Sequence, residues 1–194
     1  MPSIAAPSVP LSQVGRAAHD LGVAGLLGGN LFGRLALHPS VTEISDEAER
    51  GKVVNAAWRR YGTINTLGLA AVVVGWAGAR VDEASDPRLS PEERNLARAK
   101  DALVGVVAAV GVASAVQGMR FARKAPGGAV PLRDGDHTAP SAGDDARRAK
   151  RRLNALGAAS LLAEAGLVAV NAALDQRAFR RPPARRLIPF LGRV

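Results

Sequence analysis

The chain has 194 residues, with 26 Lys and Arg against 17 Asp and Glu, and 47% of its residues are apolar. The charges lie almost wholly outside four long apolar stretches, which disfavours disorder and also a soluble bundle whose helices alternate apolar and charged faces. Because the chain contains no cysteine, disulfides, thiolate-ligated metals and a cysteine nucleophile are excluded. We therefore expect an all-α integral membrane protein, built as a four-helix antiparallel bundle.

The N-terminal part divides into a flexible segment, residues 1–16, and a first span, residues 17–37. The first segment lacks the basic start of a signal peptide, so we expect the span to remain in the mature protein. This span is the weakest of the four, because its uncharged centre is short and is flanked by His19, Asp20 and Arg34. By itself it could equally be a buried helix of a soluble protein.

Three further stretches, residues 61–79, 102–119 and 153–174, approach the length of about 20 apolar residues that crosses a bilayer. Trp58 and Trp76 flank the second span about 27 Å apart, which fits an interfacial aromatic belt, although two core tryptophans remain the alternative. The membrane domain then covers residues 17–176, and a basic C-terminal tail covers residues 177–194.

The connections carry local helix signals. Residues 46–60 are compatible with a helix that continues into the second span, and Ser40 to Glu43 have the spacing of a capping box. Ser90, Pro91 and Glu93 combine an N-cap, a first-turn proline and a reciprocal glutamate, which predicts a helix from Pro91 through Ala122. Residues 123–143 are rich in Gly, Pro and Asp and predict a flexible loop.

Gly25, Gly29 and Gly33 recur at every fourth position of the first span. Such spacing lets two helix backbones approach closely inside lipid. We favour packing within the bundle, with the small residues of the third span as the receiving face, over the joining of two copies of the chain.

Polar residues within the spans are costly in lipid and usually face the bundle interior. At about 1.5 Å per residue, they gather in the half of the bilayer next to the first and third connections, and Glu164 lies near the midplane. We predict a polar vestibule on that side, with Glu164 as its floor and with contributions from all four helices: Asn30, Arg34, Asn65, Ser114 and Ser160. Glu164 is then a proton-titrating or ligand-contacting carboxylate, or else a structural hydrogen-bonding group between helices, and Arg34 is favoured as an interfacial residue.

The sequence contains little that indicates a metal, a cofactor or a nucleic-acid partner. The turn from Asp134 to His137 lacks further metal ligands, and no phosphate-binding loop, dinucleotide fingerprint or nucleophile elbow occurs. We therefore expect no cofactor, no metal and no nucleic acid, with the lipid bilayer as the partner. The expected location is the inner (cytoplasmic) membrane as a multi-pass protein. Nearly equal Lys and Arg counts on the two sides leave the direction of insertion open.

The four-span layout, the glycine-rich first span with Gly28, Gly29 and Asn30, and the charged connection resemble a set of small bacterial four-span membrane proteins. Part of this set is uncharacterised, and part is the anthrone-oxygenase-like family of polyketide tailoring proteins. The resemblance is architectural, covers about residues 21–174, and implies a fold without assigning catalytic residues.

The sequence is compatible with two functions. The first is a non-enzymatic bundle, acting as an accessory subunit of a membrane complex or as a homo-oligomer. The second is an enzyme or carrier for a small apolar molecule that uses the vestibule.

Overall fold

The computed structural model describes residues 11–82 and 84–180. Four long helices make up most of this part of the chain: α1 (Leu11–Phe32), α3 (Glu47–Val81), α4 (Pro91–Ala122) and α5 (Asp144–Arg180). Short helical turns join them: η1 (Gly33–Leu37), α2 (His38–Ser40), η2 (Val41–Glu43), η3 (Asp86–Arg88) and η4 (Pro126–Gly128). The all-α, four-helix prediction is confirmed.

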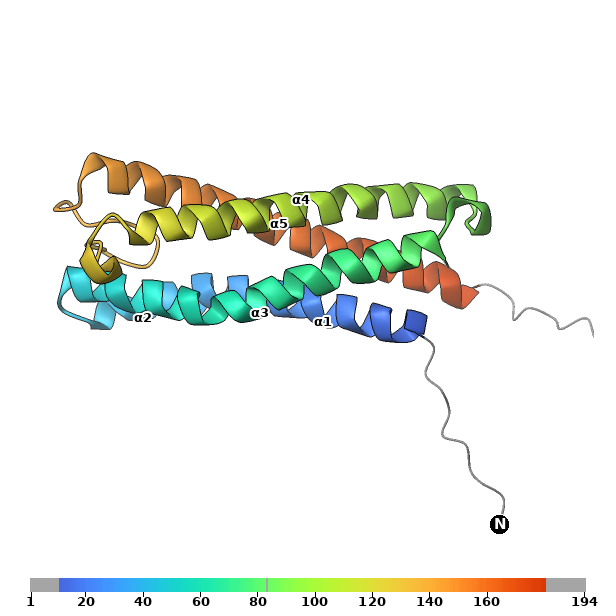
Figure 1. The fold of residues 1–194 in the computed structure, drawn as a ribbon, viewed down its shortest axis with the longest axis horizontal. Helices are drawn as coiled ribbons and strands as arrows, with labels where there is room; N and C mark the ends of the chain where they lie inside the picture. The colour runs from blue at the N-terminus through green and yellow to red at the C-terminus, as the bar shows by residue number, and fades with distance from the viewer. Residues whose placement is uncertain (1–10, 83, 181–194) are drawn as a thin grey trace, which may run out of the picture.

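The helices form two side-by-side pairs, α1 with α3 and α4 with α5 (Figure 1). One end of the bundle carries the turns between α1 and α3 and the segment 123–143, and we call it the loop end. The opposite end, where α1 begins, α5 ends and η3 lies, is called the terminal end (Figure 1). Chain direction alternates from each long helix to the next.

The helix starts follow local capping. The Ser90 side chain accepts from the Glu93 backbone N–H and the Glu93 carboxylate accepts from the Ser90 N–H, so the predicted capping box and the helix through Ala122 are confirmed. The capping box predicted at Ser40 is wrong. The next long helix is instead capped by Asp46, whose carboxylate accepts from the Glu49 N–H at 2.7 Å. As predicted, α3 runs without interruption into the second apolar stretch.

Close contact between α1 and α3 depends on glycines in the terminal half. A Cβ built on Gly22 would lie 2.6 Å from the Gly68 carbonyl oxygen, and one built on Gly75 would lie 2.6 Å from the Gly15 carbonyl oxygen. Backbone atoms cannot yield to a side chain as a flexible rotamer can, so these positions require glycine.

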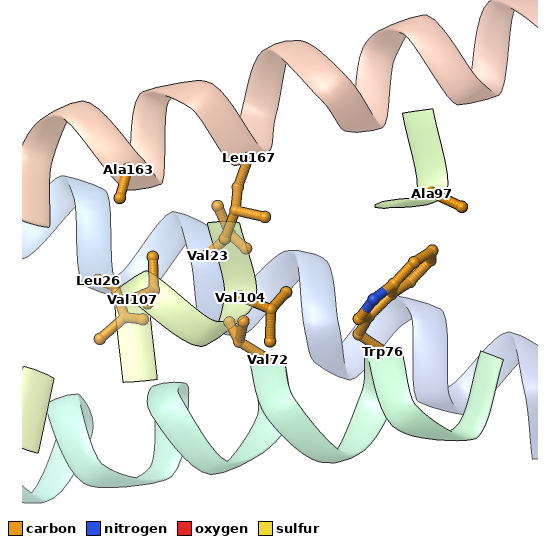
Figure 2. Packing of buried hydrophobic residues seen from close by; sticks show 9 residues of the cluster. All are labelled: Val23, Leu26, Val72, Trp76, Ala97, Val104, Val107, Ala163 and Leu167. Carbon is orange, nitrogen blue, oxygen red and sulfur yellow. The ribbon is translucent and has the colours of Figure 1, made fainter. Parts of the chain in front are cut away.

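Two apolar clusters lie at different levels of the bundle. The first joins all four long helices in the terminal half and includes Val23, Val72, Trp76, Val107 and Leu167 (Figure 2). The second lies at the loop end, where segment 123–143 contributes Val130 and Leu132 to a group with residues of α3, α4 and α5. Segment 123–143 is therefore packed on the bundle, which corrects the expectation of a flexible loop.

Both tryptophans are engaged inside the protein. Trp76 is 7% exposed and donates to the Asp101 carboxylate at 2.7 Å, and Trp58 donates to His38 at 3.2 Å. Trp76 is therefore a core residue, as the alternative to an interfacial belt had it, whereas Trp58 is half-buried.

Three helices in the described part of the chain, α3, α4 and α5, are long and apolar enough to cross a membrane. Helix α1 does not meet that criterion by itself, in keeping with its weak sequence signal. It nevertheless lies along α3 for most of the length of that helix (Figure 1).

Candidate functional site

A cavity of about 810 Å³ occupies the loop-end half of the bundle. Its walls come from the four long helices, from η1 and α2, and from segment 123–143. Five of the six residues of the predicted vestibule line it: Asn30, Arg34, Asn65, Ser114 and Ser160. The structure thus brings together polar side chains from all four long helices.

Glu164, the sixth vestibule residue, is 1% exposed and does not line the cavity itself. Its carboxylate oxygens accept from Asn30 Nδ2 at 2.8 and 2.9 Å, and Oε1 also accepts from Ser160 Oγ at 2.8 Å. Asn30 and Ser160 therefore lie between Glu164 and the cavity. A buried carboxylate is tolerated when donors compensate for its lost hydration, as these two do.

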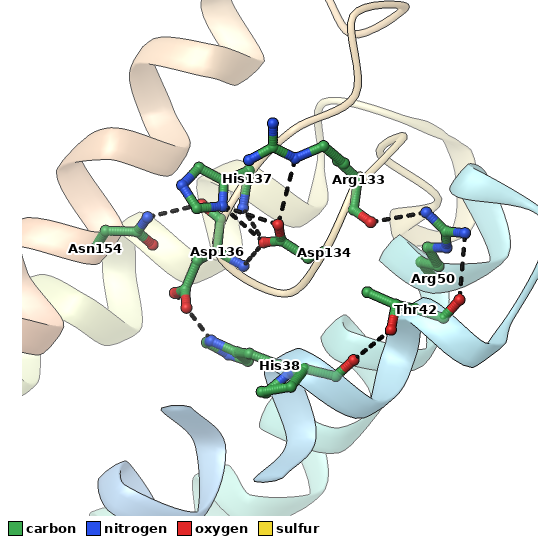
Figure 3. Close-up of polar contacts among 9 residues, drawn as sticks. His38, Thr42, Arg50, Arg133, Asp134, Asp136, His137 and Asn154 are labelled. Carbon is green, nitrogen blue, oxygen red and sulfur yellow. Dashed lines mark hydrogen bonds and ion pairs between the residues drawn. The ribbon is translucent and has the colours of Figure 1, made fainter. Parts of the chain in front are cut away.

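Arg34 does not pair with Glu164. Its Nη2 donates to the Asn154 backbone carbonyl at 2.8 Å and lies over Gly157 of α5. Asn154 donates in turn from Nδ2 to the Asp136 carbonyl at 2.7 Å (Figure 3). Arg34 thus joins the end of the first predicted span to α5 and to segment 123–143.

Ser114 and Asn65 both line the cavity but differ in how deeply they are buried. The Ser114 hydroxyl is buried, and among the described residues it has no hydrogen-bond partner. Asn65 is half-buried on α3. Both groups are placed to offer hydrogen bonds to a molecule inside the cavity.

An aromatic wall, not anticipated from the sequence, closes the α1–α3 side. His38, Trp58 and Tyr61 meet edge to face, with ring centroids 5.9 and 6.0 Å apart. The Tyr61 hydroxyl donates to the Gly25 carbonyl oxygen. The signal was present in the spacing, because Val54, Trp58, Tyr61 and Asn65 fall on one helical face and all line the cavity.

The predicted glycine face supports this wall. A Cβ at Gly29 or at Gly33 would run into the ring of Tyr61 or of Trp58, whereas Gly25 meets only Ile64 at 3.9 Å. The face is thus used within the chain, as favoured. Its receiver is α3, however, and not the third predicted span, because the two large rings need the space that the glycines leave.

His38 links the wall to segment 123–143. Its Nε2 accepts from Trp58, so Nδ1 carries the proton and donates to Asp136 Oδ1 at 3.0 Å (Figure 3). Burial lowers the pKa of His38, the nearby Lys150 charge lowers it further, and Asp136 acts in the opposite direction. The hydrogen-bond pattern and the pKa direction both describe a neutral imidazole.

Lys150 is the second group that sequence reasoning missed. It lines the cavity near the start of α5, is 6% exposed, and has no carboxylate within ion-pair distance among the described residues. Burial lowers its pKa to about 8, although the Asp136 and Asp134 carboxylates oppose this shift. The α5 face that carries Glu164, Ser160, Gly157 and Asn154 extends back to Lys150, and this periodicity could have revealed it.

The turn from Asp134 to His137 is held by its own hydrogen bonds. Asp134 Oδ1 accepts from the backbone N–H groups of Asp136 and His137, both at 2.8 Å (Figure 3). Within the described residues, no group of three or more His, Asp or Glu side chains could hold a metal ion.

Comparisons with protein-family models, curated proteins and solved structures give no match to this chain. They neither support nor refute the resemblance to the anthrone-oxygenase-like family.

Proposed function

We propose that this chain is an integral protein of the cytoplasmic membrane whose four long helices all cross the bilayer, and that it binds or carries a small amphipathic molecule in the loop-end cavity. The observation that carries the proposal is a cavity of about 810 Å³ lined by polar residues of all four helices. This size falls within the range of small-molecule sites.

The outer surface supports the membrane part of the proposal. Large apolar side chains project from every long helix of the bundle, among them Leu21 at 74%, Leu67 at 66%, Val112 at 57% and Leu162 at 76% exposure. Lipid would cover such residues, whereas in water they would remain exposed as apolar surface on every side chain named.

Helix α1 crosses together with α3 in this proposal. A Cβ built on Gly75, near one end of the second span, would lie 2.6 Å from the Gly15 carbonyl oxygen of α1, and His38 contacts Trp58 near the other end. The α1–α2 segment therefore covers the same depth as the span beside it. Gly22, Gly29 and Gly33 and the polar side chains of His19 and Asn30 contact neighbouring helices, which explains how a weak apolar signal can accompany a full crossing.

The cavity lining indicates the chemistry of the occupant. Leu67, Ala115 and Leu153 offer apolar contacts, and Asn65 and Ser114 offer hydrogen bonds. At the loop end, Lys150 supplies a buried ammonium without an ion-pair partner among the described residues. A molecule with an apolar body and a carboxylate, or a comparable anionic group, would match both the apolar lining and the Lys150 ammonium.

The alternative of a self-associating or accessory bundle without a ligand has less support. Gly29 and Gly33 are occupied by rings of the same chain, so self-association would need another face. Anthrone-oxygenase-like chemistry remains a narrower version of the ligand-binding proposal, with the small apolar molecule as substrate.

The two tryptophans allow a direct test of ligand binding. Trp58 lines the cavity, whereas Trp76 is packed in the terminal half. In lipid nanodiscs, 11-bromoundecanoic acid should quench the Trp76→Phe variant saturably, and undecanoic acid should relieve the quenching. The Trp58→Phe variant should show only a shallow, non-saturating change. Equal, non-saturating quenching of both variants would contradict a cavity ligand and would favour the accessory bundle.

The crossings are tested separately, because the native chain lacks thiols. Single cysteines at Gln13, Thr42, Ser90 and Ser141 are exposed positions at the two ends of the bundle. With an impermeant reagent on intact cells, Gln13 should label together with Ser90, and Thr42 together with Ser141, on opposite sides. Labelling of Gln13 and Thr42 on the same side would show that α1 does not cross.

A further inference from the structure

A second concave feature lies on the α4–α5 side of the loop end, apart from the cavity. We call it the basic groove. It has a volume of about 490 Å³, and five of its eight lining residues are cations: Arg120, Arg123, Lys124, Arg148 and Arg152. Asp145 is its one acidic residue.

The basic groove continues into an apolar groove of about 600 Å³. The two share Gln117, Arg120 and Arg152, and the apolar part adds Ala113, Val116, Ala155 and Leu156. On each helix these residues recur at three- and four-residue spacing, so they form one continuous strip along the α4–α5 seam.

The cations of the groove are unevenly neutralised. Asp145 pairs with Arg148 and lies 4.0 Å from Lys124. Among the described residues, Arg120, Arg123 and Arg152 have no carboxylate within ion-pair distance. The groove therefore presents at least three uncompensated positive charges around one hollow.

The depth of the groove matches the headgroup region of a bilayer. Arg120 directly follows the third predicted span, and Arg152 directly precedes the fourth. The basic groove then lies at the level of lipid phosphates, and the apolar groove lies beside the acyl chains. Basic pockets between membrane helices at this level are suited to anionic lipid headgroups.

We propose that the α4–α5 seam is a binding site for an anionic phospholipid of the surrounding leaflet. The lipid phosphate lies among Arg120, Arg123 and Arg152, and one acyl chain lies along the apolar groove. The inference rests on the membrane insertion proposed above and is independent of any ligand in the cavity. It also assigns the loop end to the leaflet that is richer in anionic lipid.

The test uses purified protein in a neutral detergent with phosphatidylglycerol or phosphatidylcholine added, and native mass spectrometry reads the bound lipid. The variant R120Q/R123Q/R152Q removes the unpaired cations. The variant K52Q/R60Q/R151Q removes the same charge from exposed loop-end positions outside the groove. We expect phosphatidylglycerol affinity to fall about fivefold for each groove arginine, on the order of 100-fold in all, with little change in the control variant.

The apolar groove is tested with a matched pair of Ala→Phe variants. Ala155→Phe fills the apolar groove and leaves the arginines in place, whereas Ala165→Phe makes the same change at an exposed α5 position outside it. Only Ala155→Phe should weaken phosphatidylglycerol binding. Glycerophosphoglycerol, the headgroup without acyl chains, should bind far more weakly than the lipid.

Three results would overturn the lipid site: equal loss in both charge variants, equal affinity for phosphatidylcholine, or equal binding of the acyl-free headgroup. If the cysteine pattern shows that the helices cross and phosphatidylglycerol is still not selected, this inference fails alone. If Ser90 and Ser141 label on the same side, the membrane proposal fails with it.

Discussion

The terminal half and the loop-end half of the bundle are built from the same four helices, yet one is packed and the other is hollow. In the terminal half, Gly22 and Gly75 face backbone atoms of the neighbouring helix, so α1 and α3 touch. In the loop-end half, Gly111, Ala115 and Gly118 of α4 and Gly157 and Ser160 of α5 all line the cavity.

A small residue closes an interface when backbone or a large ring lies opposite, and it leaves space when nothing fills the room beside it, as at Gly118, where nothing lies within 4 Å of a built Cβ. Gly29 and Gly33 illustrate the first case within the hollow half, because Tyr61 and Trp58 fill the space that they leave. Glycine spacing therefore predicts close approach only when the opposing residue is known.

The largest effect is expected from a side chain inserted into the packed half. Gly22→Leu would push against the Gly68 carbonyl, and we expect a loss of about 3 kcal/mol or more, since backbone cannot repack as side chains do. Gly28→Leu is the control, because nothing lies within 4 Å of a Cβ there. Thermal unfolding in detergent measures both, and equal destabilisation would refute the backbone contact.

The second-largest loss of stability is expected when the buried Glu164 carboxylate is removed. Glu164→Leu leaves the donors of Asn30 and Ser160 without their acceptor, and we expect about 2–3 kcal/mol of destabilisation. Glu164→Gln retains one carbonyl oxygen and should cost less. If both variants unfold at the same temperature as the native protein, the hydrogen bonds contribute nothing to the fold.

A matched pair of Ala→Leu variants compares the two halves most simply. Ala163→Leu adds bulk to the packed cluster and should destabilise by about 1–3 kcal/mol. Ala115→Leu adds the same bulk to the cavity and should leave the melting temperature nearly unchanged while it lowers affinity for 11-bromoundecanoic acid at least tenfold. If Ala115→Leu destabilised the protein and Ala163→Leu did not, the open space would lie in the terminal half and not in the loop-end half.

The last prediction is a gain in stability instead of a loss. Lys150→Met removes a buried ammonium and should stabilise the protein by about 1–3 kcal/mol while it weakens binding of the anionic probe. The folded pKa of about 8 lies below the ordinary 10.5, so the unfolded state binds more protons between these values. Native stability should therefore rise from about pH 8 to about pH 10.5, and this rise should be absent in Lys150→Met. A parallel pH profile in the two proteins would show that Lys150 is not buried.

Sequence reasoning reached the helices and the deep polar residues because both depend on local spacing. Ser90 and Glu93 cap α4 through contacts three residues apart, and Ser160 and Glu164 share a face one turn apart. The depth of Asn30 relative to Glu164 followed from counting residues along antiparallel spans.

The residues that sequence reasoning missed depend on tertiary contacts. His38 and Lys150 lie beyond the predicted spans, and segment 123–143 brings Asp136 to His38 although 98 residues separate them. Composition predicted a flexible loop there, but Val130 and Leu132 are 1% and 0% exposed and hold it on the bundle. The burial of these two apolar residues thus determines that the segment is packed, despite its high Gly and Pro content.

The central claim is that one half of the bundle is open to small molecules and the other is not. Cysteine placed at Ser114, in the cavity wall, and at Ala163, in the packed cluster, measures this difference by the rate of reaction with a small methanethiosulfonate reagent. We predict fast modification at Ser114 that undecanoic acid slows, and negligible modification at Ala163 in the folded protein. Equal rates at the two positions, or a Ser114 rate unaffected by undecanoic acid, would contradict the account.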